Sequence, residues 1–61
     1  MNTYMELNIK SLISYLEAFK TQMKMCAMKD DATIDKQEEK VLKKINKLTD
    51  KFIDELEAYI D

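Results

Sequence analysis

Apolar residues recur along the first half of the chain at alternating steps of three and four. The series consists of Met5, Ile9, Leu12, Leu16, Phe19, Met23 and Cys26. Side chains three and four apart share one face of an α-helix, so this spacing predicts a helix over about residues 4–28 with the series as its packing seam. A second series has the same spacing and comprises Val41, Ile45, Leu48, Phe52, Leu56 and Tyr59, widened by Leu42, Ile53 and Ile60. It predicts a second helix over about residues 35–60.

Residues 29–34 separate the two predicted helices as a short acidic turn. The adjacent carboxylates Asp30 and Asp31 oppose the negative end of the first helix dipole, which favours a helix end there. Asp35 precedes Glu38 by three residues, the spacing of a capping box that opens a helix. We therefore predict an all-α fold, a single domain over residues 1–61 formed by an antiparallel hairpin of two helices. A single bent helix is the alternative, because no glycine follows the first helix.

A second face of the first predicted helix carries no charged side chain. Its members are Tyr4, Leu7, Ser11, Ser14, Ala18, Thr21, Met25 and Met28. A helix that lacks charge on two faces is usually buried on two sides, and small side chains let helices approach closely. We therefore predict that two hairpins form a homodimer, a four-helix bundle. The predicted self-association residues are Leu7, Ser11, Ser14, Ala18, Thr21 and Met25. The alternative is that these short polar side chains belong to a solvated face.

Composition limits the classes of protein to which the chain can belong. A chain of 61 residues buries only about 60% of the surface that its unfolded form exposes, so association is expected. One cysteine and no histidine exclude an internal disulfide and a His-based metal or catalytic site. The chain shows neither a secretory signal nor a long apolar span, so we predict a cytoplasmic protein without membrane contact. Abundant lysine, isoleucine and asparagine without arginine fit an AT-rich bacterial or phage genome.

Two segments contain residue types that bind metals. Residues 23–28 are rich in sulfur ligands suited to Cu(I), but helical spacing points Met23 and Cys26 away from Met25 and Met28. Residues 31–38 are similar to the second half of a calcium loop, although Ala32 stands where such a loop needs glycine. We predict no metal, no cofactor and no small-molecule ligand. No set of residues forms a catalytic signature, so we predict that the chain is not an enzyme.

Lysines line one side of the second predicted helix. They are Lys36, Lys40, Lys43, Lys44, Lys47 and Lys51. Such a stripe can lie against phosphates, although the net charge of −2 and the absence of arginine favour a solvated face.

The sequence thus favours a small non-enzymatic interaction protein, such as an inhibitor, adaptor or regulator. It would act through helix faces on a protein partner, with Tyr4, Tyr15 and Met28 as candidate contacts, because interfaces are enriched in aromatic and methionine side chains. The alternative is an RNA- or DNA-binding regulator that uses the lysine stripe.

Overall fold

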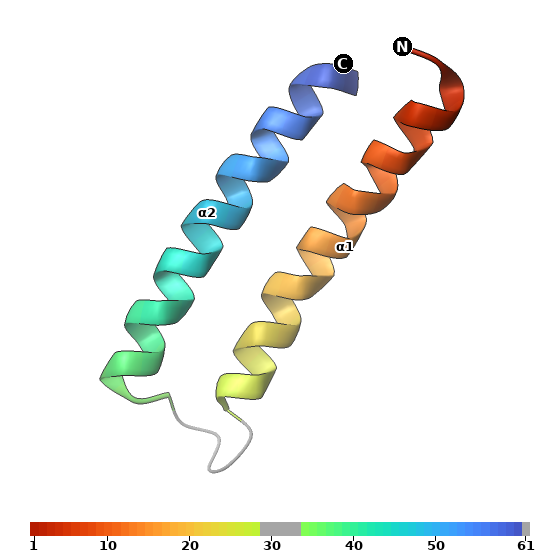
Figure 1. Ribbon diagram of the computed structural model, residues 1–61. Coiled ribbons are helices and arrows are strands. Elements are labelled where there is room, and N and C mark those ends of the chain that lie inside the picture. The colour runs from red at the N-terminus through yellow and green to blue at the C-terminus, as the bar shows by residue number, and fades with distance from the viewer. Residues whose placement is uncertain (29–33, 61) are drawn as a thin grey trace.

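Two helices run antiparallel along each other in the computed structural model of the chain (Figure 1). The structure describes residues 1–28 and 34–60, and it contains no strand within these ranges. Helix α1 spans Thr3–Ala27 and helix α2 spans Lys36–Ile60, with 25 residues in each. Both chain ends lie at the same end of the pair (Figure 1). The all-helical prediction is confirmed, and each described boundary falls within one residue of its predicted position. The predicted turn, apart from Ile34, lies outside the described residues.

Side chains cap the beginning of each helix. The Asn2 carboxamide oxygen accepts a hydrogen bond of 2.8 Å from the Met5 backbone N–H, a cap that was not predicted from the sequence. At the start of α2, the Glu38 backbone N–H donates to Asp35 Oδ1 over 2.8 Å. In return, the Asp35 N–H donates to Glu38 Oε1 over 3.1 Å. These reciprocal bonds confirm the predicted capping box and fix where the second helix begins.

Replacing Asp35 with alanine should lower the free energy of unfolding by about 1 kcal/mol, because the Glu38 N–H loses its acceptor. Chemical denaturation followed by circular dichroism measures this loss. The control is Asp35→Asn, which retains an acceptor oxygen and should lose much less. Equal losses in the two variants would show that the hydrogen bond is not the cause.

The core of the hairpin is a narrow strip between the helices. On α2, Ile53 is 5% exposed and Leu42 is 8% exposed, and Thr49 is buried beside them. No residue of α1 is fully buried. Apolar side chains of α1 that reach the strip are half-buried, namely Ile9, Ile13, Leu16, Phe19, Met23 and Ala27. Two helices alone therefore cover only part of the apolar surface that the sequence provides.

The contact face of α1 is rotated from the predicted seam by one row of residues. Met5, Leu12 and Cys26 belong to the predicted seam but are exposed. Ile13 and Ala27 are half-buried instead, and each lies one position after a predicted seam residue. The apolar surface of α1 is wider than one neighbouring helix can cover, so the α-helical period alone did not determine which row faces α2.

Helix α2 shows the same rotation. The sequence placed the residues of the main series at the seam, yet four of them are exposed: Val41, Leu48, Phe52 and Tyr59. The core uses the widening residues Leu42 and Ile53 together with Thr49, which lies on the same face at helical spacing. The predicted apolar face exists, but its edge rather than its centre faces α1.

Candidate interaction surfaces

The exposed apolar residues from the two helices flank the core strip on one side of the hairpin. We call this surface the lateral face, and it consists of Met5, Leu12, Cys26, Val41, Leu48, Phe52 and Tyr59. A hollow of about 400 Å³ near the connection is lined by Cys26 from α1 and by Glu38 and Val41 from α2, so both helices contribute to this side. An apolar surface that runs along both helices is typical of a protein contact.

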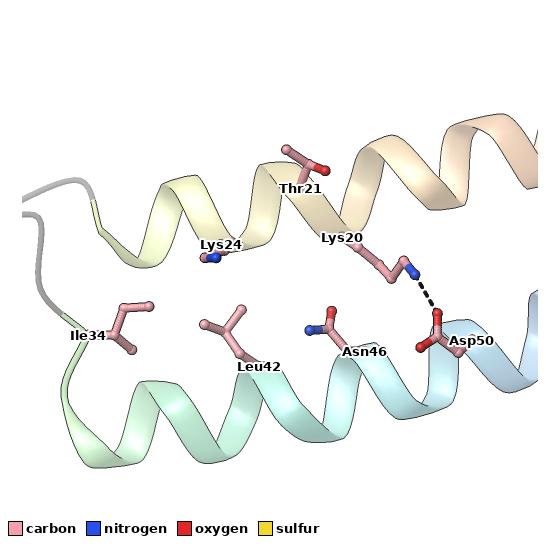
Figure 2. A pocket seen from close by; sticks show the side chains of 7 residues that line it. All are labelled: Lys20, Thr21, Lys24, Ile34, Leu42, Asn46 and Asp50. Carbon is pink, nitrogen blue, oxygen red and sulfur yellow. Dashed lines mark hydrogen bonds and ion pairs between the residues drawn. The ribbon is translucent and has the colours of Figure 1, made fainter.

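The opposite side of the hairpin is polar (Figure 2). The Lys20 ammonium donates to Asp50 Oδ1 across the helix pair, and it also lies 3.7 Å from Glu17 Oε2. The hydrogen bond to the Asp50 carboxylate raises the pKa of Lys20 above its ordinary value, against a smaller opposing effect of desolvation. Lys20 therefore stays charged at neutral pH. This contact was not predictable from the sequence, because Lys20 and Asp50 are thirty positions apart and helical spacing does not relate them.

Asn46 lies beside this ion pair and points toward α1 (Figure 2). Its Oδ1 atom is buried and has no hydrogen-bond partner among the described residues. The hollow around it, of about 390 Å³, is lined by both charged and apolar side chains, including Lys24, Ile34 and Leu42. A buried amide oxygen without a partner destabilises the pair. The polar side therefore holds the helices in register at some cost in stability.

The outer face of α1 lies on the side of that helix opposite to α2. We define it by the uncharged set Tyr4, Leu7, Ser11, Ser14, Ala18, Thr21, Met25 and Met28. All of these are exposed except Met28, which is half-buried. Tyr4 is 83% exposed, and Thr21 points away from α2 (Figure 2). The predicted self-association residues thus lie together on one open surface.

Tyr15 is also exposed, at 64%, and helical spacing places it between the outer face and the lateral face. Together with Tyr4 it gives α1 two aromatic side chains that do not contribute to the core strip. Met28, the third predicted partner contact, is less accessible than these two. The uncharged surface of α1 is therefore continuous from the lateral face around to the outer face.

The lysine stripe occupies an exposed face of α2. All six predicted lysines are exposed. Lys43 Nζ lies 3.3 Å from Glu39 Oε1, an ordinary ion pair one helical turn apart. The same glutamate lines a small hollow of about 210 Å³ with Lys36, Lys40 and Lys43. The positive charge of the stripe is thus partly neutralised at its N-terminal end.

The described residues contain no group of three or more Cys, Asp or Glu side chains placed to hold a metal ion. Cys26 is a free, exposed thiol rather than the buried side chain that its predicted seam position implied. Asp35 and Glu38 of the calcium-loop-like segment cap α2, and residues 31–33 of that segment lie outside the described residues. The absence of a metal or cofactor stays a prediction.

Neither described helix has the length and apolar character required to cross a bilayer. No family model, curated protein or solved structure matches the chain.

Proposed function

We propose that the chain is a small non-enzymatic interaction protein that dimerises into a four-helix bundle and binds a protein partner through a helix face. The observation that carries the proposal is the outer face of α1. It extends along the whole helix without one charged residue, and it exposes Tyr4, Leu7 and Met25. A solvated helix face is normally rich in charge, whereas the centre of a protein interface is depleted of charge and enriched in aromatic and methionine side chains.

A protein is the partner that best fits this surface. Nucleic acids are bound mainly through cations that neutralise phosphates, and the outer face offers none. A groove on another protein can bind an amphipathic helix through residues spaced by three and four, and the members of the outer face from Tyr4 through Leu7 to Met25 follow one another at such steps. The exposed thiol of Cys26 favours a reducing compartment, so we place the protein in the cytoplasm.

The lysine stripe supports a second candidate function, an RNA- or DNA-binding regulator. Its six exposed lysines cover adjacent rows on the outside of α2. Dimerisation would bring two stripes into one particle and increase the number of phosphate contacts. The absence of arginine, the Lys43–Glu39 ion pair and the net charge of −2 make this candidate the weaker of the two.

Site-specific photo-crosslinking separates the two candidates. A photoreactive amino acid replaces Tyr4 on the outer face or Lys40 on the lysine stripe, and each protein is irradiated in an extract of its native cells. We expect position 4 to form one saturable adduct with another protein, which excess wild-type chain suppresses. Excess Tyr4→Glu/Met25→Glu chain should not suppress it, because two charges then stand on the outer face.

Two results would contradict the protein-binding proposal. One is the absence of any saturable protein adduct at position 4. The other is an adduct confined to position 40 that is removed by nuclease and weakens steeply with salt, which would identify nucleic acid as the ligand.

A further inference from the structure

We infer that the lateral face is the dimer interface and that its occupant is the same face of a second copy of this chain. The two hairpins stack about a two-fold axis perpendicular to the helices, so α1 packs antiparallel on the partner's α1 and α2 on the partner's α2. This inference rests on the proposed dimerisation. It assigns the dimer interface to the lateral face instead of the outer face of α1, where the sequence predicted it. The outer face of α1 then stays free for a different protein.

The exposed area of the chain has the size that such an interface requires. The single hairpin exposes 5260 Å², whereas a compact monomer of 7.2 kDa is expected to expose about 4,100 Å². The excess of about 1,100 Å² exceeds the ~800 Å² that each partner buries in a standard stable interface. On one side of the hairpin, much of the exposed apolar area belongs to the large side chains of the lateral face. Among them, Leu48 is 66% exposed and Phe52 is 44% exposed.

The α1 row on this side matches itself under two-fold symmetry. Met5, Leu12, Phe19 and Cys26 are spaced by seven, and the midpoint of the row lies between residues 15 and 16. An antiparallel copy about that midpoint places Met5 against Cys26 of the partner subunit and Leu12 against Phe19 of the partner subunit. The two outer pairs join a long side chain with a small one, and the two inner pairs join two large apolar side chains.

The adjoining α2 row is also symmetric about its midpoint, and its one charged member, Glu38, would lie at the end of the row against Tyr59 of the partner subunit. Glu38, Ile45, Phe52 and Tyr59 are also spaced by seven, with their midpoint between residues 48 and 49. Lys24 lies across from Leu42 in the hairpin (Figure 2), and Lys20 pairs with Asp50 further along, so the middle parts of the two rows lie beside each other in the antiparallel pair. One two-fold axis therefore serves both helices.

Charge and shape fit a second copy as well. A two-fold interface brings each side chain near its own counterpart, so charges near the axis would repel each other. The α1 row and the row beyond it, which contains Asn8, Tyr15 and Gln22, carry no charge. The hollow of about 400 Å³ beside Cys26 and Val41 lies at the end of the lateral face that would receive Met5 and Tyr59 of the partner subunit. The end of one subunit with large exposed side chains thus packs against the hollowed end of the other subunit.

Cysteine cross-linking tests the inference. We change Met5→Cys in the full chain, keep the native Cys26, and oxidise the protein. A disulfide between positions 5 and 26 within one chain is excluded, because 21 residues of helix separate them by about 31 Å. We expect a covalent dimer in which peptide mass spectrometry finds residue 5 joined to residue 26. The wild-type protein should give no such dimer, because its two Cys26 residues would lie about 31 Å apart.

A matched variant tests the outer face in the same way. It carries Ser11→Cys and Ala18→Cys with Cys26→Ser, and residues 11 and 18 would meet in an antiparallel dimer formed through the outer face. A link from 11 to 18 without one from 5 to 26 would overturn the lateral-face inference and leave the dimer intact. Wild-type Cys26 joined to Cys26 would also overturn the inference.

Sedimentation velocity of the reduced wild-type protein is the companion measurement. A dimer that Leu48→Glu dissociates and Ser14→Lys leaves intact supports the inference. The opposite pattern contradicts it. A monomer at all concentrations would overturn both the dimer and the interface, whereas protein binding by the outer face is tested separately by photo-crosslinking.

Discussion

Replacing Ile53 with alanine is expected to lower the free energy of unfolding by about 3 kcal/mol. Ile53 is the most deeply buried apolar side chain of the described residues, at 5% exposed, and it sits in the strip between α1 and α2. Its truncation removes apolar contact and leaves a cavity that two helices held by a narrow core cannot easily close. Small proteins have little stability to lose, so a large fraction of the variant should be unfolded at 37 °C.

Urea denaturation at one fixed protein concentration measures this effect, because the stability of an associating protein depends on concentration. Tyr4→Ala is the matched control. Tyr4 is a large side chain on the outer face, and its truncation should change the free energy of unfolding by no more than about 0.5 kcal/mol. Similar losses in the two variants would mean that Ile53 does not lie in the principal core.

Replacing Asn46 with leucine is expected to raise the free energy of unfolding by about 1–2 kcal/mol. The Asn46 Oδ1 atom is buried without a partner, so folding removes it from water with no compensating hydrogen bond. A leucine of similar size removes that penalty and adds apolar contact beside Leu42. The thermal midpoint should rise accordingly.

The control for this prediction is Asn46→Ala, which removes the amide without adding a larger apolar group. This variant should have nearly the same free energy of unfolding as the wild type, because the lost packing is offset by the removal of the unpaired oxygen. A lower free energy of unfolding for Asn46→Leu would contradict the prediction and would mean that Asn46 Oδ1 has a hydrogen-bond partner in solution. Polar residues at helix contacts can also fix one pairing, so sedimentation should check that the Leu variant keeps a single assembly state.

The sequence was sufficient to predict the helices and the start of α2. A spacing of three and four predicted both helices, and the Asp35 and Glu38 pair predicted the capping box that the structure contains. These features depend on residues close together in the chain, where the covalent geometry of a helix determines which groups meet. The Asn2 cap was missed because the apolar series began only at Met5.

The packing between the helices could not be predicted in the same way. Leu48 and Ile53 lie at opposite edges of the wide apolar face of α2, and periodicity gives no reason to bury one edge and expose the other. The choice follows from contacts across the pair, including the ion pair of Lys20 with Asp50. A helix with a wide apolar face can present several rows to a single neighbour, and only the arrangement in space selects one.

Both helices carry more apolar rows than the contact between them can bury, and the remaining rows are available for association. A hairpin that needed only its own two helices would require one apolar row on each, with charge elsewhere. Here α1 remains uncharged on the lateral and outer faces, and α2 exposes Leu48 and Phe52. We attribute the lateral face to a second copy and the outer face to a protein partner. On this proposal, association links the stability of the hairpin to its function.

Thermal unfolding at a series of protein concentrations, with sedimentation equilibrium on the same samples, tests this link most directly. We predict a species of twice the chain mass and a melting temperature that rises as the concentration increases, because dilution favours dissociated and unfolded chains. A monomer of 7.2 kDa that melts cooperatively at the same temperature at every concentration would contradict the claim that the hairpin is stabilised by association.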